Sequence, residues 1–138
     1  MWFYYALLSA LFAAFTAVFA KIGVANISSN LATGIRTVII LIMVWSIVLI
    51  KGDLKGISSL SKMNITFLVL SGVATGLSWL FYFKALQIGK ISQVASVDKL
   101  SVAIAIILSV LFFKETLTLK TTIGALLIIS GTILFAIK

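Results

Sequence analysis

The stretch Ile91–Phe113, ISQVASVDKLSVAIAIILSVLFF, decides the fold class of this chain. Its 23 residues are long enough for an α-helix to cross the hydrocarbon core of a bilayer, which is about 30 Å thick and needs about 20 residues. Asp98 and Lys99 are the charged residues that interrupt the apolar run. The stretch therefore predicts a transmembrane helix that carries charge inside the membrane.

The rest of the chain repeats this apolar pattern on both sides. We predict helices over residues 2–22, 31–50, 64–88, 91–113 and 119–137, separated by short polar connectors. The 138 residues are 62% hydrophobic and 10% charged, whereas a soluble domain carries about 25% charged residues. Almost nothing is left for a soluble domain. The sequence thus predicts an all-α membrane protein that forms one transmembrane domain over residues 1–138.

The amino-acid composition also limits the chemical reactions and ligands that the side chains can support. The chain has neither Cys nor His, so thiol nucleophiles, disulfides, imidazole acid–base groups and the usual soft metal ligands are absent. It has no ATP-binding motif. We predict a protein that is not an enzyme and that uses no metal and no other cofactor.

The net charge of +8 points to membrane lipids rather than to nucleic acid as a partner. The basic residues are scattered over loops and helix ends, without a basic stripe or an aromatic stacking platform. A Lys near anionic headgroups contributes about 1 kcal/mol to membrane binding.

Five spans place the two termini on opposite faces of the membrane. We call the face with the N-terminus face A and the other face B. The basic residues are Lys51, Lys55, Lys62, Lys114 and Lys120 on face A, and Lys21, Arg36, Lys84, Lys90, Lys99 and Lys138 on face B. Orientation follows the asymmetry of Lys and Arg near the helix ends. Because that asymmetry is weak here, we predict that the chain inserts in both orientations.

Two pairs of glycines indicate where helices touch. Gly72 and Gly76 form a GxxxG pattern in the third helix, and Gly124 and Gly131 lie seven residues apart on one face of the fifth. Small residues let helix backbones approach closely in lipid. The contacts form either within one chain or between two copies, and both alternatives stay open.

Four ionisable residues lie inside the predicted helices and approach a similar depth from face B: Arg36, Lys84, Asp98 and Lys99. A charge at a helix centre costs about 2.5–3.5 kcal/mol on insertion scales, so these residues are candidates for a substrate or ion pathway. Lysines near helix ends can instead snorkel to the interface. The aromatic run of Trp79, Phe81, Tyr82 and Phe83 forms either an interfacial belt or the lining of a site for an organic substrate.

The position of Asp98 on its helix suggests its partners. Projection at 100° per residue puts Asp98 and Ser101 on a stripe of small and polar residues that faces protein or water. Lys99 points about 100° away, so we expect Asp98 to pair with Arg36 or Lys84 of another helix. Asp98 is then either part of a transport mechanism or half of a structural ion pair.

Two strings closely resemble the second half of an EamA domain, the repeat unit of the drug/metabolite transporter superfamily: ALQIGKISQVASVDKLSVAIAIILSVLFFKETLT at 85–118 and IGALLIISGTILFAI at 123–137. FAKIG at 19–23 and Arg36 extend the resemblance, more loosely, over the whole chain. It implies a five-helix repeat. Larger relatives contain two inverted repeats with a substrate pathway between them. The resemblance therefore implies an antiparallel homodimer, or assembly with a homologous half-unit.

The same resemblance implies a secondary-active transporter or exporter of a small organic metabolite that works by alternating access. Small multidrug exporters rely on a carboxylate in the first helix, which has none here, so their mechanism for cationic drugs is disfavoured. Neighbouring cations outnumber Asp98, which favours an anionic or zwitterionic substrate. We expect a multi-pass protein of a bacterial or archaeal inner membrane. The alternatives are a flippase of an amphiphilic or polyisoprenyl-linked lipid, and a non-transporting assembly subunit.

Overall fold

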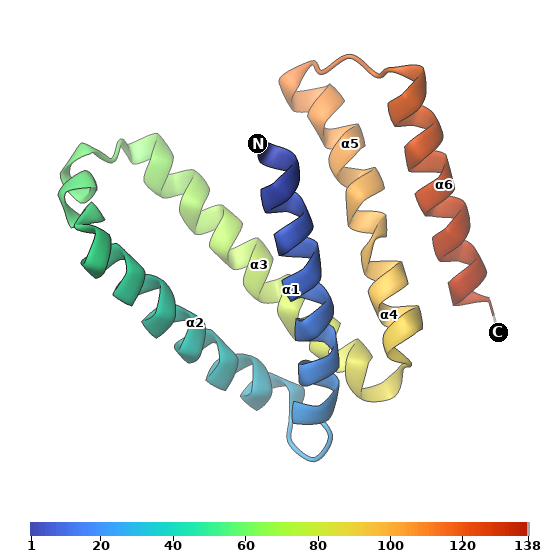
Figure 1. Ribbon diagram of the computed structural model, residues 1–138, viewed down its shortest axis with the longest axis horizontal. Helices are drawn as coiled ribbons and strands as arrows, with labels where there is room; N and C mark the ends of the chain where they lie inside the picture. Colours follow the sequence, from blue (N-terminus) through green and yellow to red (C-terminus); the bar gives the residue numbers. More distant parts are fainter. Residues whose placement is uncertain (138) are drawn as a thin grey trace. The chain divides into compact units, whose positions relative to one another are not determined.

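A computed structural model describes residues 1–137 of the chain, and all the regular structure in that part is helical. Lys138, which the charge count above places on face B, lies outside the described residues. The elements in chain order are α1 (Trp2–Gly23), α2 (Ser29–Lys51), the 3-10 helix η1 (Asp53–Ser59), α3 (Lys62–Ile88), α4 (Ile91–Asp98), α5 (Leu100–Phe113) and α6 (Leu119–Ala136) (Figure 1).

Five helical segments are long and apolar enough to cross a membrane, namely α1, α2, α3, α4 with α5, and α6. The prediction of an all-α membrane protein with five transmembrane helices is confirmed. The observed ends differ from the predicted ends by two residues or fewer.

The span predicted over 91–113 is one candidate membrane span in the structure, and within it the helix is interrupted at Lys99, which separates α4 from α5. Lys99 keeps nearly helical backbone angles, with φ −69° and ψ −10°. Its backbone N–H donates to the carbonyl of Ser96 at 3.1 Å, and its own carbonyl accepts from the N–H of Val102 at 3.0 Å. Both bonds span three residues, as in a 3-10 turn, so the helix tightens here without changing direction sharply.

Local sequence explains where several helices begin and end. The Ser28 hydroxyl oxygen accepts from the backbone N–H of Leu31 at 3.2 Å, and the Thr118 hydroxyl oxygen accepts from that of Thr121 at 3.2 Å. These side chains satisfy N–H groups that have no partner in the first turns of α2 and α6. Gly52 ends α2 with φ 72°, a left-handed conformation that glycine adopts without steric cost.

The described chain divides into two compact units. The first comprises Met1–Phe19 and the segment that begins at Ile88, and the second comprises Ala20–Gln87. In the first unit, α6 packs against both α4 and α5. The α6 residues that are partly or fully covered recur with helical spacing: Gly124, Ala125, Ile128, Ile129, Gly131 and Thr132.

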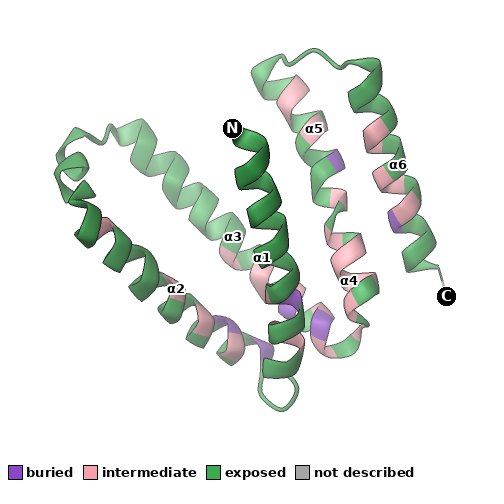
Figure 2. Ribbon diagram, in the orientation of Figure 1, coloured by how far each residue is buried: buried purple, intermediate pink, exposed green. Residues whose placement is uncertain are grey.

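Burial in the second unit is concentrated where α3 ends and α2 begins. Phe83 and Leu86 of α3 are 1% and 0% exposed, and Ser29 and Thr33 of α2 are also buried (Figure 2). These positions recur at intervals of three and four residues, so each helix buries one stripe.

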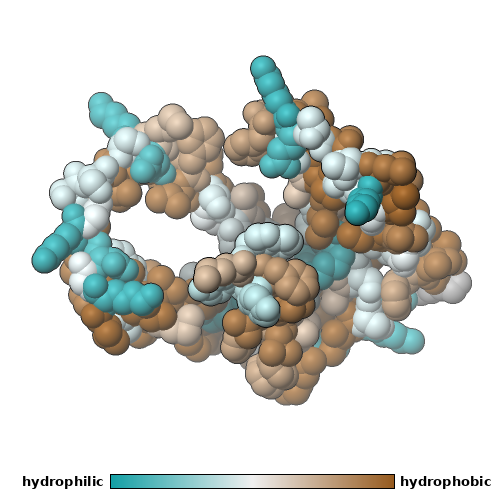
Figure 3. All heavy atoms as spheres, turned by 45° about the horizontal axis from the view of Figure 1, so that its top comes forward, coloured by the Kyte–Doolittle hydropathy of each residue, from teal (hydrophilic) through white to brown (hydrophobic). Residues whose placement is uncertain are grey.

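Most of the helical surface is apolar and exposed. In each span, no more than 6% of an apolar stretch of 18 residues is buried within the described chain. The face seen in Figure 3 is largely hydrophobic, and large apolar side chains such as Leu41, Phe67 and Phe112 are among the exposed ones. Such a surface is suited to contact with lipid or with other transmembrane helices.

Candidate functional site

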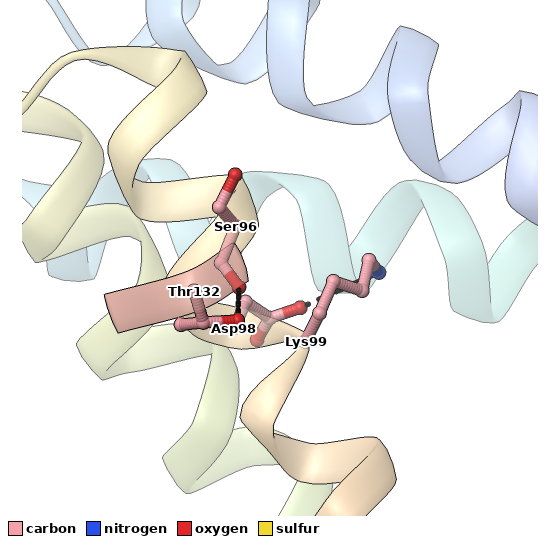
Figure 4. Close-up of polar contacts among 4 residues, drawn as sticks. All are labelled: Ser96, Asp98, Lys99 and Thr132. Atoms are coloured by element: carbon pink, nitrogen blue, oxygen red, sulfur yellow. Dashed lines mark hydrogen bonds and ion pairs between the residues drawn. The ribbon is translucent and has the colours of Figure 1, made fainter. Parts of the chain in front are cut away.

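The interruption of the fourth span is the first candidate site. A backbone carbonyl there, that of Ser96, accepts a hydrogen bond from the Thr132 hydroxyl of α6 at 3.2 Å (Figure 4). The same hydroxyl lies 2.8 Å from the carbonyl of Ile128 in its own helix. Thr132 is 4% exposed, so this polar contact is shielded within the first unit. Neighbouring Ser and Thr side chains let a membrane helix depart from regular geometry, because they satisfy backbone groups that lipid cannot.

The ionisable pair lies at this interruption. The Asp98 carboxylate oxygen Oδ2 is 3.8 Å from the Lys99 ammonium Nζ, and the two side chains are 39% and 57% exposed. The expectation that Lys99 points away and does not pair with Asp98 is therefore wrong. A helical projection treats side chains as radial vectors, whereas the four-carbon stem of a lysine can bend back toward its neighbour.

The contact between Asp98 and Lys99 is a weak one. At 3.8 Å it is too long for a hydrogen bond, and half-exposed pairs contribute little to stability. Asp98 thus keeps acceptor capacity for a proton, a cation or a residue of another chain. The predicted pairing of Asp98 with Arg36 or Lys84 of the second unit stays a prediction. Among the described residues, no group of three or more His, Cys, Asp or Glu could hold a metal ion.

Ser101, which was predicted on the Asp98 stripe, is exposed on α5. Ala103 is the buried residue of that helix, at 6% exposure. The stripe that contains Ser101 therefore differs from the α5 face that is buried in the single chain.

Arg36 forms the second candidate site, in the second unit. Its guanidinium carbon Cζ lies 4.4 Å from the centroid of the Trp79 ring and 4.8 Å from that of Phe83. Trp79 and Phe83 are four residues apart on α3 and so share one face of that helix. Both distances are within the range of a cation–π interaction. Within the predicted aromatic run, Trp79 contacts Arg36 directly, and Tyr82 makes an edge contact with Phe83 at 5.8 Å between ring centroids.

Backbone carbonyls anchor the end of the second unit next to this site. The Lys21 ammonium donates to the carbonyl of Leu86. The Gln87 amide nitrogen donates to the carbonyls of Val24 and Ile27 at 3.0 and 2.7 Å. These bonds tie the end of α3 to the end of α1 and to the connector between α1 and α2.

Lys84 is exposed on α3, on a different face from the buried stripe that carries Phe83. The structure therefore brings Arg36 and Trp79 together but leaves Lys84 outside their contact. A role for Lys84 in a pathway stays a prediction.

Sequence reasoning missed Gln87 and Thr132, and it named Phe83 only as part of the aromatic run, without its contact with Arg36. The position of Phe83, four residues after Trp79 and next to Tyr82, was a usable signal for a shared aromatic face. Thr132 stood out only as a polar residue in an apolar helix. The long-range partners of Gln87 and Thr132, 63 and 36 residues away, have no local signal in the sequence.

Comparison with known proteins decides the family. The profile of the EamA-like transporter family matches residues 1–137. The chain belongs to this family. An uncharacterized transporter from a Sinorhizobium species, encoded in the region 3′ of cobO, is 48% identical over 136 residues, which cover 99% of this chain and 96% of that protein. An uncharacterized protein of Methanocaldococcus jannaschii is 38% identical over 97 residues, 70% of this chain and 69% of that protein. No solved structure matches significantly.

The four glycines of this EamA-like chain have room around them. Beyond the neighbouring backbone of its own helix, a Cβ atom added at Gly72, Gly76, Gly124 or Gly131 meets no atom of the described chain within 4 Å. Contacts within the single chain therefore do not require glycine at these positions. The predicted seam, within one chain or between two copies, stays a prediction.

We expect Gly131→Leu to weaken self-association while the chain still inserts. Overpacking a close contact costs about 1–3 kcal/mol, so the dissociation constant of a dimer in detergent should rise about tenfold. Analytical ultracentrifugation measures this constant. Gly56→Leu is the control, because Gly56 also has open space but lies in η1, outside the spans. An unchanged constant for Gly131→Leu would remove this face of α6 from any dimer contact.

Proposed function

We propose that this EamA-like protein is a secondary-active transporter of a small organic metabolite and that two antiparallel copies form the working unit by alternating access. The family and the Sinorhizobium relative support membrane transport in general. That relative is matched over 96% of its length, so it too is about the size of one five-helix unit. A cell inner membrane of a bacterium or archaeon is the proposed location.

The observation that carries the proposal is the interrupted fourth span. Secondary transporters place substrate and ion sites where a membrane helix is discontinuous, near the interface of inverted repeats. Here the interruption lies about 10 Å from the start of α4, since Asp98 is the seventh residue after Ile91. The ionisable pair Asp98 and Lys99 lies at this interruption, and the Ser96 carbonyl accepts a hydrogen bond from Thr132 of α6.

A second copy accounts for exposed polar groups at this depth. Asp98 and Lys99 are half-exposed in the single chain, and ionisable side chains inside membranes face protein or water rather than lipid. An antiparallel partner would enclose them in a cavity between the copies. The basic residues of the chain, 11 against 3 acidic ones, favour anionic or zwitterionic cargo.

Transport by the purified protein in proteoliposomes tests this proposal. Labelled organic acids and amino acids are offered with an imposed proton or sodium gradient, and we expect gradient-dependent accumulation of at least one solute above that in protein-free vesicles. Exchange of labelled solute for unlabelled solute across the membrane, without an imposed gradient, would also show that the protein is a carrier. Movement of fluorescent lipid between leaflets, without any solute flux, would identify a flippase and contradict the proposal. Inactivity in both assays would favour an assembly subunit.

A further inference from the structure

Arg36 lies within the second candidate membrane span, Ser29–Lys51. It is the seventh residue after Ser29, so its backbone is about 10 Å from the start of α2. Counted from Ile88, where α3 ends, Phe83 and Trp79 lie at depths of about 8 and 13 Å. The guanidinium contacts both rings and therefore lies between these two levels. The side chain is thus held against the two rings of α3, whereas arginines near helix ends commonly extend toward the interface.

The Arg36 guanidinium lacks a hydrogen-bond acceptor on one side. Its nitrogen Nη1 is buried and has no hydrogen-bond partner among the residues that the structure describes. The acidic residue of the second unit is Asp53, which is 17 residues farther along the chain and, at helical rise, about 25 Å away. Within that unit, no carboxylate can reach Arg36.

Other polar groups near this end of the unit already have partners. The Gln87 amide binds the Val24 and Ile27 carbonyls, and the Thr33 hydroxyl donates to the carbonyl of Ser29 at 2.8 Å. A charge without a hydrogen-bonded partner in a membrane span is costly, and such residues usually mark substrate or ion sites. Aromatic faces offset part of this cost, but they supply no acceptor for an N–H group.

We propose that Arg36 binds an oxyanion, the carboxylate or phosphate group of the transported solute, while the rings of Trp79 and Phe83 hold its guanidinium. This inference rests on the proposed transport function and names the chemical class of the cargo. The Trp79 and Phe83 rings lie within 5 Å of the guanidinium carbon Cζ, and the Nη1 donor has no hydrogen-bond acceptor among the described residues. A guanidinium presents a planar fork of donors that fits the two oxygens of a carboxylate or a phosphate.

The natural reporter of this site is Trp79. The chain has three Trp residues, so Trp2→Phe with Trp45→Phe leaves Trp79 as the only indole. In this background, purified protein in detergent is titrated with acetate, inorganic phosphate or chloride at constant ionic strength. We expect acetate or phosphate to change the Trp79 fluorescence saturably, and chloride at the same concentration to have little effect.

Substitution of Arg36 gives the decisive comparison. Arg36→Gln should raise the apparent dissociation constant for the oxyanion about tenfold or more, because a hydrogen bond to a charged group is worth about 1.5–3 kcal/mol. Arg36→Lys keeps the charge without the planar fork of donors. Its apparent dissociation constant should lie between those of the wild type and Arg36→Gln. Lys51→Gln is the control, because it removes a cation from the exposed far end of α2. Size-exclusion chromatography establishes that each variant is folded.

Three outcomes would overturn the inference. The first is an equal response of wild type and of both Arg36 variants. The second is a response to added phosphatidylglycerol alone, which would assign the site to a lipid headgroup. The third is binding that appears only after Asp98→Asn, which would mean that a carboxylate of a second copy occupies the site. Oxyanion binding without any transport would refute the proposed transport function but not the oxyanion site. Transport that does not depend on Arg36 would support the transport function and refute the oxyanion site.

Discussion

Replacement of Asp98 by Asn is expected to lower transport about 10- to 100-fold, the effect of losing about 1.5–3 kcal/mol from an interaction with a charged group. Asp98 is the acidic residue that lies within the spans, and it is located where the fourth span is interrupted. Asn keeps the shape of the side chain and removes its charge and its proton. If Asp98 couples solute movement to an ion gradient, the variant should retain exchange of bound solute but lose gradient-driven accumulation.

The same variant should fold and insert normally. The contact between Asp98 and Lys99 is 3.8 Å long and half-exposed, so its loss has little effect on stability. Thermal unfolding and flux are measured for Asp98→Asn, Lys99→Gln and the double variant. Asp53→Asn in η1 is the control for the loss of one carboxylate outside the spans. An unstable Asp98→Asn chain that Lys99→Gln restores would show a structural pair instead.

The five spans could be predicted from sequence because one physical requirement dominates them. Backbone groups in lipid must be satisfied within the segment, so length and apolar composition suffice to identify each helix. The ends of the helices could be predicted from the polar connectors between them, and in the structure the Thr118 hydroxyl accepts the backbone N–H of Thr121 where α6 begins.

The contacts between helices could not be predicted in the same way. Helical periodicity gives the direction of a side chain, but not its length or the neighbour it meets. This is why the contact of Lys99 with Asp98 was missed. No proline or glycine marks the interruption at Lys99 in the sequence. Thr132, whose hydroxyl donates to the Ser96 carbonyl there, is 36 residues away along the chain. The sequence identifies Arg36 as a candidate by its charge alone. Its contacts with Trp79 and Phe83 depend on how α2 and α3 are placed, which the sequence does not show.

Oppositely oriented copies are expected to be inactive alone and active together. Additional lysines hold the face that carries them in the cytoplasm. Ser58→Lys, Ser59→Lys and Thr116→Lys add charge to face A, and Ala25→Lys with Asn26→Lys adds charge to face B, all at exposed positions in connectors. Reporters fused to the C-terminus should place the two locked forms on opposite sides, and the unmodified chain on both.

Solute flux through these locked forms, expressed singly and together, tests the antiparallel unit most directly. We predict that each form alone falls to the background of empty membranes, because it cannot supply the inverted partner. Co-expression should restore flux to at least half that of the unmodified chain at equal protein levels. Full flux through one locked form alone, or a mixture no more active than its components, would contradict the antiparallel dimer.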